Sequence, residues 1–376
     1  MKKVLIILSM FLLLCGCGKG SSETVLDKFV KKLENVNSYN LKGTMSIVSN
    51  EDTFTYNVEA SKSKEGYYKV SLVNRTNDHE QVILKNEDGV YVVTPDLNKS
   101  FKFQSDWPNN GSQSYLLDVL LNDVVNDENV FVDKKDNVNF IQCRVNYPNN
   151  STLYSEKIYL NDDFGVKKIE VLDKDGNVKI TMEVSDIDYK PKFNDNYFDL
   201  DSLITEDSNK DEGTKIDSGN KTEDDNKKVE NNDSELNNNT EEEKQDNNLE
   251  SQSSQDTSYI LEDIIYPLYV PANTHLSTED TISTENGNRA ILTFAGDSPF
   301  VLVEEVSQRF DEMEIIPVNG DPLVMSDSIG AISSNSMYWT SNGVDYYLSS
   351  TSLDSEELMT IAEGLTGTSI IVSSEK

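Results

Sequence analysis

Apolar and polar side chains alternate along most of the chain between residues 39 and 187. Residues 39–47, 54–60 and 68–72 carry an apolar side chain at almost every second position. A period of two turns one face of each strand toward a core, which is typical of antiparallel sheets. The same pattern predicts further strands at residues 140–147, 157–160, 167–172 and 178–187.

Turn residues separate these strands. Asp88-Gly89 and Asp175-Gly176 are dipeptides of the kind that supply the positive φ required by tight hairpins. Residues 163–165, with the sequence Asp-Phe-Gly, indicate a third turn. Successive strands joined by short turns favour a long antiparallel meander over a parallel sheet.

Helical spacing interrupts the meander in two places. Val25, Phe29 and Leu33 recur every four residues, which predicts an N-terminal helix capped by Ser22. Apolar positions within residues 114–126 predict a second helix. The order helix, meander, helix, meander predicts an α+β fold, in which a curved antiparallel sheet wraps the helices and buries their apolar faces.

A strongly acidic segment divides the chain. Residues 205–250 contain sixteen acidic and six basic residues, and only four large apolar ones. Such a segment cannot bury enough surface to offset the entropy lost on ordering. We therefore predict a disordered linker at residues 203–257, which separates a folded unit at residues 17–202 from another at residues 258–376. A less favoured alternative is that the acidic segment binds cations.

The second unit has a pattern of its own. Its alternation predicts a small α+β domain with strands at residues 289–294, 300–307, 313–318, 338–340 and 344–348. Turns are expected at residues 319–321 and 341–343, where Asn and Gly occur together. Leu358, Ile361 and Leu365 lie on one face of a final helix over residues 352–365, with Ser352 as its expected cap.

The first residues have the pattern of an export signal. Lys2 and Lys3 precede an apolar run at residues 4–14, which is shorter than the roughly 20 residues that span a bilayer. The run ends in Leu14-Cys15-Gly16-Cys17, which resembles the bacterial lipobox. This resemblance implies that residues 1–16 are a cleaved signal peptide and that Cys17 carries the lipid, such as palmitate. An ordinary secretory signal is the alternative.

Processing at Cys17 would leave Cys143 as the one free thiol of the mature chain, because the sequence has three cysteines. An intrachain disulfide is then excluded. Cys143 lies within a predicted strand, so we interpret it as a buried structural thiol.

Charge and histidine content exclude several classes of function. The formal net charge of −34 disfavours binding to nucleic acid and to anionic lipid headgroups. The two histidines, His79 in a predicted turn and His275 in a predicted loop, lie in different predicted units. Neither has the spacing of a zinc site or of a catalytic triad. We predict no catalytic residue, no metal site and no cofactor, and hence a protein that is not an enzyme.

Aromatic residues are the more suggestive feature. Phe101, Phe103 and Trp107 precede the second predicted helix. They either cover the core of the sheet or line and gate an apolar groove.

Two segments of the first unit resemble a known superfamily. The sequence Gly-Val-Tyr-Val-Val-Thr-Pro-Asp-Leu-Asn-Lys at residues 89–99 and the sequence at residues 163–169 resemble the LolA/LppX/RseB superfamily, and the order of elements agrees with it. This resemblance implies a half-open β-barrel that binds lipid, lipoprotein or protein. Within the superfamily the chain is most similar to the germination lipoprotein GerS and its relatives. The second unit resembles the small C-terminal domain of RseB-like proteins.

These resemblances imply a non-enzymatic lipoprotein on the outer face of the cell membrane, in an envelope of Gram-positive type. Its expected role is to bind a cell-wall enzyme, such as an amidase, during cortex modification in sporulation or germination. Two alternatives are a sensor that reports to an anti-sigma factor and a carrier of lipid or lipoprotein. The sequence does not name the partner, and it does not indicate an oligomeric state.

The lipid anchor can be tested at the thiol that would carry it. We expect Cys17→Ser to abolish labelling of the protein by radioactive palmitate and to release the protein from the membrane fraction, because the remaining chain has no other apolar anchor of sufficient length. Unchanged labelling and unchanged membrane retention would contradict the assignment of Cys17.

Overall fold

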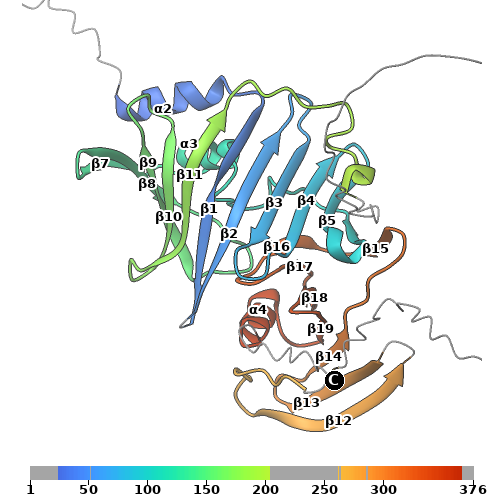
Figure 1. Ribbon diagram of the computed structural model, residues 1–376. Helices are drawn as coiled ribbons and strands as arrows, with labels where there is room; N and C mark the ends of the chain where they lie inside the picture. Colours follow the sequence, from blue (N-terminus) through green and yellow to red (C-terminus); the bar gives the residue numbers. More distant parts are fainter. Residues whose placement is uncertain (1–23, 51, 204–260, 262–263, 285–286, 366–376) are drawn as a thin grey trace, which may run out of the picture. The chain divides into compact units, whose positions relative to one another are not determined.

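In the computed structural model of the chain, the strands of the described residues form two β-sheets (Figure 1). The predicted signal peptide, Cys17 and the predicted linker from residue 204 onward lie outside the residues that the structure describes, and they remain predictions. The described residues are 24–50, 52–203, 261, 264–284 and 287–365. Those before residue 205 and those after residue 259 belong to one compact unit.

The first sheet has twelve strands, and eleven of them come from the first half of the chain. Their order is β15-β6-β5-β4-β3-β2-β1-β11-β10-β9-β8-β7, so the sheet is open and does not close into a barrel. The strands from the first half of the chain are β1 (Tyr39–Ser49), β2 (Asp52–Lys62), β3 (Tyr68–Asn74), β4 (Glu80–Asn86), β5 (Gly89–Thr94), β6 (Lys99–Phe103), β7 (Phe131–Lys135), β8 (Val138–Arg144), β9 (Leu153–Leu160), β10 (Val166–Asp173) and β11 (Val178–Asp188).

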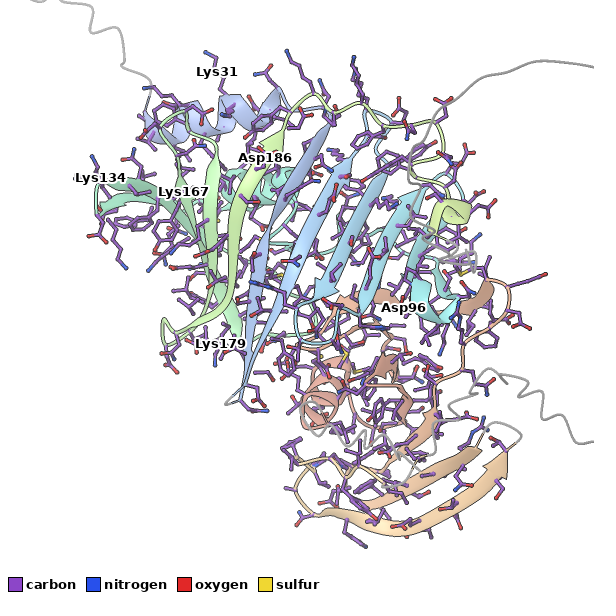
Figure 2. All side chains as sticks on the ribbon, viewed as in Figure 1. Lys31, Asp96, Lys134, Lys167, Lys179 and Asp186 are labelled. Atoms are coloured by element: carbon purple, nitrogen blue, oxygen red, sulfur yellow. The ribbon has the colours of Figure 1, made fainter. Side chains whose placement is uncertain are left out.

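The alternation predicted for this sheet is confirmed by burial. In β3 every second residue is buried, with Tyr68, Val70 and Leu72 facing inward. These residues share one core with two helices, α2 (Val25–Glu34) and α3 (Leu117–Asn126). Three charged residues, Lys134, Lys167 and Asp186, are exposed and project outward (Figure 2). The predicted α+β architecture, a curved sheet around helices, is therefore confirmed.

Two short 3-10 helices complete the first half: η1 (Pro95–Leu97) and η2 (Leu200–Leu203). The hairpins form as the sequence predicts, with φ of +143° at Gly89 and +85° at Gly176. In the turn at residues 163–165 the positive φ, +63°, belongs to Phe164 and not to the glycine that follows it.

Helix caps differ from the predicted ones. Thr24 caps α2 and forms a capping box with Asp27, whereas the predicted cap, Ser22, lies outside the described residues. The final helix, α4 (Ser355–Glu363), is capped by Asp354, whose carboxylate accepts the N–H groups of Glu356 and Glu357. Ser352 was therefore the wrong cap: its backbone N–H donates to Ser350 instead.

Helix α3 begins at Leu117, three residues after its predicted start at Ser114. The backbone N–H of Leu117 donates to the buried hydroxyl of Tyr39 at 3.2 Å. This contact from the sheet satisfies a free helical N–H group where no side chain of the helix itself acts as a cap.

The second sheet has seven strands in the order β12-β13-β14-β19-β18-β17-β16. Helix α4 packs on it and shares a core with Trp339 and Leu348. The strands of the second half of the chain, including β15 of the first sheet, are β12 (Thr274–Thr284), β13 (Gly287–Gly296), β14 (Phe300–Val306), β15 (Glu314–Val318), β16 (Asp321–Val324), β17 (Ile329–Ile332), β18 (Ser336–Ser341) and β19 (Val344–Ser350).

Seven of the described strands have no counterpart among the predicted ones: β4, β5, β6, β7, β12, β16 and β17. Every residue of β7 is exposed, and nearly every residue of β12 is exposed as well. A strand without a buried face shows no alternation of apolar and polar residues, so only its backbone hydrogen bonds identify it as a strand. His275 was consequently expected in a loop, whereas it lies on β12, opposite Ala295.

Strand β15 joins the two halves of the chain. It was expected within the second unit, but it pairs in parallel with β6 at the edge of the first sheet, where Glu314 lies opposite Lys99. Asn98 supports the junction, because its carbonyl accepts the N–H of Glu314 at 2.8 Å and its side-chain amide donates to the carbonyl of Phe310 at 2.9 Å. The pairing covers an edge strand that would otherwise present unpaired backbone groups.

A buried ion pair reinforces this junction. The Nζ atom of Lys99 lies 2.6 Å from Oδ2 of Asp345 and 3.0 Å from the hydroxyl of Tyr338. The side chain of Lys99 is 2% exposed and that of Asp345 is 16% exposed. Burial lowers the pKa of Lys99, and the carboxylate of Asp345 opposes that shift.

Removing one partner of this pair tests how much it contributes. We expect Lys99→Met to lower the free energy of unfolding by about 3 kcal/mol, because it leaves the carboxylate of Asp345 buried without its cation. Lys42→Met is the matched control, since Lys42 pairs with Glu59 on the surface and both side chains are at least 40% exposed. The control should cost less than about 1 kcal/mol. Equal losses in urea unfolding of the two variants would contradict the role assigned to Lys99.

Candidate functional site

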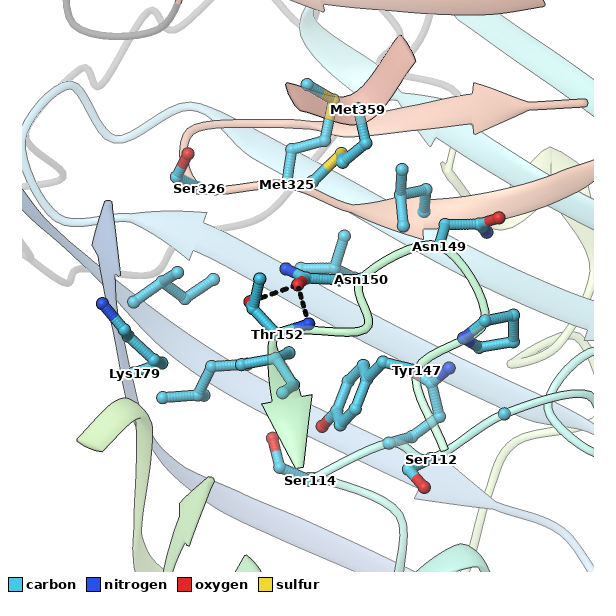
Figure 3. Close-up of a pocket in the computed structure, with 18 of the residues that line it drawn as sticks. Ser112, Ser114, Tyr147, Asn149, Asn150, Thr152, Lys179, Met325, Ser326 and Met359 are labelled. Atoms are coloured by element: carbon cyan, nitrogen blue, oxygen red, sulfur yellow. Dashed lines mark hydrogen bonds between the residues drawn. The ribbon is translucent and has the colours of Figure 1, made fainter. Parts of the chain in front are cut away.

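A cavity of about 240 Å³ opens beside the inner face of the first sheet (Figure 3). Its walls come from β1, the start of β11, the loops at residues 110–115 and 147–153, strand β16 with the turn after it, and helix α4. These segments are far apart in the sequence. The cavity therefore exists only once the second half of the chain has docked against the first sheet.

One part of the wall is apolar and rich in methionine. Met45 and Ile47 project from β1 because the alternation of that strand turns them inward. Met325 follows β16, and Met359 comes from α4 (Figure 3). Methionine side chains are flexible and polarizable, so such a wall can adapt to apolar groups of different shapes.

Another part of the wall carries amide and hydroxyl groups from two loops. Ser112 fixes the loops to each other, because its hydroxyl accepts the N–H of Asn146 at 2.8 Å and its own N–H donates to the carbonyl of Asn146 at 2.7 Å. The side-chain oxygen of Asn150 accepts from the backbone N–H and from the hydroxyl of Thr152 (Figure 3). Ser114 and Asn149 complete this polar surface.

Two residues of the lining, Tyr147 and Ser326, have buried hydroxyl groups, and a hydrogen bond with Ser114 acts on that of Tyr147. The ring of Tyr147 lies beside Ser114 (Figure 3). Burial, and after it the nearby carboxyl of Glu156, raise the pKa of Tyr147 well above its ordinary value. Tyr147 thus presents a neutral hydroxyl.

Behind Tyr147 lies a buried group of acids and a thiol. The side chain of Glu156 is fully buried, and one of its oxygens accepts from the thiol of Cys143 at 3.5 Å. Burial raises the pKa of Glu156 well above its usual range, and Asp123 adds to this effect. Burial raises the pKa of Asp123 to about 6, while a hydrogen bond from Ser112 opposes the shift. Glu156 is therefore a weaker acid than an exposed glutamate.

Cys143 is free and buried, as predicted. Burial raises the pKa of its thiol, and the carboxyl of Glu156 raises it further. A thiol held in its protonated form is a poor nucleophile. The position of Cys143 therefore suits a structural role.

Charged residues are few on the walls. Lys179 is the single basic residue among those that line the cavity, and Asp321 and Glu363 are the acidic ones. Burial raises the pKa of Glu363, and Lys179 opposes that shift. The lining therefore offers no cluster of cations that would hold a phosphate or a carboxylate.

Phe101, Phe103 and Trp107, which the sequence singled out, are at most 2% exposed. Phe101 packs on Tyr338 with ring centroids 4.7 Å apart, and Trp107 meets Tyr68 edge-on at 5.8 Å. None of the three is among the residues that line the cavity described above. They occupy the core of the first sheet and its junction with the second half of the chain.

One histidine lies in a turn of the first sheet, and the other lies on a strand of the second sheet. The ring of His79, in the turn between β3 and β4, lies 3.2 Å from a carboxylate oxygen of Asp96, and His275 lies on β12. Among the described residues no group of three or more His, Cys, Asp or Glu side chains is arranged to hold a metal ion. Within the same residues, no helix has the length and apolar character needed to cross a membrane.

Sequence reasoning missed the cavity. No pattern in the sequence marks Asn149, Asn150, Met325 and Met359 as parts of one surface. Their common surface depends on contacts such as that between the hydroxyl of Tyr56 and the carbonyl of Ser326, 270 positions apart in sequence. The available signal was the composition of two loops, the one at residues 147–153 with adjacent asparagines and the one at residues 110–115 with several serines. The local sequence does not show that these loops lie next to each other.

The structure thus combines an open curved sheet with a partly open cavity. The sequence matches the sporulation protein YdcC-like family over residues 1–198. Over 359 residues it is also 33% identical to Sporulation protein YdcC of Bacillus subtilis (strain 168), and this alignment covers 95% of this chain and 94% of that protein. The chain therefore belongs to the YdcC-like family of sporulation proteins.

Similarity to solved structures is remote. The crystal structure of MucB matches at 11% identity and a TM-score of 0.30, and covers 93% of this chain and 97% of MucB. The LolA superfamily protein NE2245 from Nitrosomonas europaea matches at 12% identity and a TM-score of 0.28, and covers 47% of this chain and 97% of that protein. Likeness at this level supports no functional conclusion.

Asp123 gives the site a testable pH dependence. Its pKa of about 6 in the folded chain exceeds the value of about 4 in the unfolded chain, so the folded state binds more protons between these two values. Stability should therefore fall as the pH rises from about 4 to about 6, by about 3 kcal/mol for this group.

Asp123→Asn should remove that part of the pH dependence. Asp186→Asn is the matched control, because Asp186 is an exposed carboxylate on β11 (Figure 2). The measurement is urea unfolding at several pH values between 4 and 7. A slope that Asp123→Asn leaves unchanged would contradict the assignment.

Proposed function

We propose that this chain is a lipid-anchored envelope protein that binds a protein partner during sporulation and does not itself catalyse a reaction. Membership of the YdcC-like family is the observation that carries the role in sporulation. The cavity, with apolar, amide and hydroxyl groups on its walls, supports binding as the molecular activity.

Anchoring at Cys17 is part of the proposal. Cleavage after residue 16 would leave Cys17 at the new N-terminus, seven residues before the cap of α2 at Thr24. A tether of that length spans at most about 25 Å. The first sheet would therefore stay close to the outer face of the cell membrane, where a partner in the envelope is within reach.

The proposed domain organisation follows the same scheme. Residues 17–202 would form a GerS-like binding domain, residues 203–257 an acidic linker, and residues 258–376 a small domain like the one at the C-terminus of RseB-like proteins. The junction at β15 would let the linker loop out while both folded parts stay together.

The proposed partner is a cell-wall enzyme such as an amidase, which acts in cortex modification or germination. The resemblance of residues 89–99 and 163–169 to GerS and its relatives motivates this choice. The chain would hold the enzyme at the membrane as a scaffold.

Affinity purification tests this function. A tagged chain, solubilised from membranes of sporulating cells, should enrich a cell-wall enzyme relative to an untagged strain, and its deletion should lower the yield of spores that germinate normally. Cys17→Ser should reduce both effects, because the scaffold would leave the membrane. A normal germination yield together with no enriched envelope protein would refute the proposal.

The same purification distinguishes two other roles. Enrichment of an anti-sigma factor would indicate a sensor like RseB. A lipid retained through native mass spectrometry, without a protein partner, would indicate a carrier.

A further inference from the structure

The two sheets end in four edge strands within the described part of the chain, and three of these strands are protected against further pairing. Strand β16 has four residues and contains Pro322, and β15 has five residues and contains Pro317. Strand β7 has five residues and carries Lys134 and Lys135. Short length, proline and lysine are common devices that keep a sheet edge from accepting another strand.

The fourth edge strand, β12, has none of these devices. It has eleven residues, Thr274–Thr284, and contains no proline, lysine or arginine. It is the outermost strand of the second sheet (Figure 1), and among the described residues it pairs with β13 only. In an antiparallel pair every second residue turns its N–H and C=O groups away from the neighbouring strand. Strand β12 therefore offers a long row of backbone donors and acceptors to an additional strand.

The side chains of β12 are accessible as well. All of its residues except the two at its ends are exposed. Leu276 is 37% exposed and Ile282 is 49% exposed, and both are large aliphatic side chains that a neighbouring strand would partly cover. An added strand would thus gain side-chain contacts together with its backbone hydrogen bonds.

Charge selects the kind of strand that fits. Glu279 and Asp280 lie at the middle of β12, and as consecutive residues of a strand they point to opposite faces of the sheet. The hydroxyl of Tyr266 donates to Glu279 at 2.6 Å, which leaves the negative charge in place. Arg289 of the neighbouring strand β13 is already bound to Glu305. The free edge is therefore acidic on both faces.

A second copy of this chain does not fit the edge. Antiparallel pairing of β12 with itself about its middle would bring Glu279 and Asp280 close to the same carboxylates of the other copy, and like charges on paired strands are destabilising. The formal net charge of −34 adds repulsion between copies. A strand with basic residues at its centre would instead gain from both carboxylates.

We infer that the free edge of β12 binds an extended segment of the partner protein as an eighth strand of the second sheet, with basic side chains at the centre of that segment facing Glu279 and Asp280. The inference rests on the proposed function and names the surface that recognises its partner. Strand addition of this kind takes its affinity from backbone hydrogen bonds and its specificity from alternate side chains.

Hydrogen exchange of the purified full chain reports on the edge directly. The probe is the blocked peptide acetyl-Thr-Val-Thr-Lys-Lys-Thr-Val-Thr-amide at about 10 mM, a concentration that largely saturates a site of millimolar Kd. We expect exchange of the outward-pointing amides of β12 to slow about tenfold at that saturation, because they gain acceptors. Exchange in β7, another edge strand, is the internal control and should not change.

Two altered peptides serve as controls. Replacing the two lysines by glutamates should abolish the protection, because the new carboxylates would face Glu279 and Asp280. Replacing the two inner threonines by prolines keeps the charge but removes backbone donors, and it should abolish the protection too. No protection by the lysine peptide, or equal protection by either control peptide, would overturn the inference.

A charge reversal on the strand separates binding from folding. Asp280→Lys should weaken binding of the lysine peptide about tenfold. It should leave the Tm within about 2 °C of the parent value, because Asp280 is exposed. Asp186→Lys is the matched control, since it makes the same charge change at an exposed residue of β11 in the first sheet, and it should leave the affinity unchanged. Equal affinities of the two variants would contradict the inference.

The outcomes distinguish the inference from the proposed function. A sporulation partner that co-purifies equally with the Asp280→Lys and Asp186→Lys chains binds elsewhere, so only the inference fails. Protection of β12 by the lysine peptide, with no enriched partner and a normal germination yield, would uphold the strand site and refute the proposed function.

Discussion

The pairing of β15 with β6 is the constraint on which the rest of the structure depends. It takes a strand from residues 314–318 and adds it to the edge of a sheet that the first half of the chain builds. Lys99 then crosses from the first sheet to Asp345 on β19, in a nearly dry environment. Such a pair contributes little net stability, but it defines one arrangement, because a misaligned charge would remain buried and unpaired.

That arrangement creates the cavity. With β15 fixed, the turn after β16 lies against β2, where the hydroxyl of Tyr56 donates to the carbonyl of Ser326 at 2.7 Å. Gln81 makes a second contact, because its side chain exchanges two hydrogen bonds with the backbone of Ile329. The methionine wall therefore contains residues from both halves of the chain.

Much of the fold was predictable from the sequence, and the reasons are physical. Strands β1, β2 and β3 have one buried face, so their composition alternates; β7 and β12 lack such a face and left no pattern. The sheet that β15 joins was not predictable, because an apolar strand can pair with the edge of either sheet. The cavity was missed for a related reason: Tyr147, Ser326 and Met359 become neighbours only through tertiary docking. Phe101 and Trp107 attracted attention as aromatic residues, and they proved to be core.

The central claim is that the two joined halves of the chain bind the partner as one body. Hydrogen exchange of the full chain, with and without the partner recovered from sporulating cells, tests it most directly. The account predicts slower exchange along β12, at residues 274–284, and unchanged exchange in β6 and β15, because the junction stays closed in the complex. Unchanged exchange along β12, or faster exchange in β6 and β15, would contradict it.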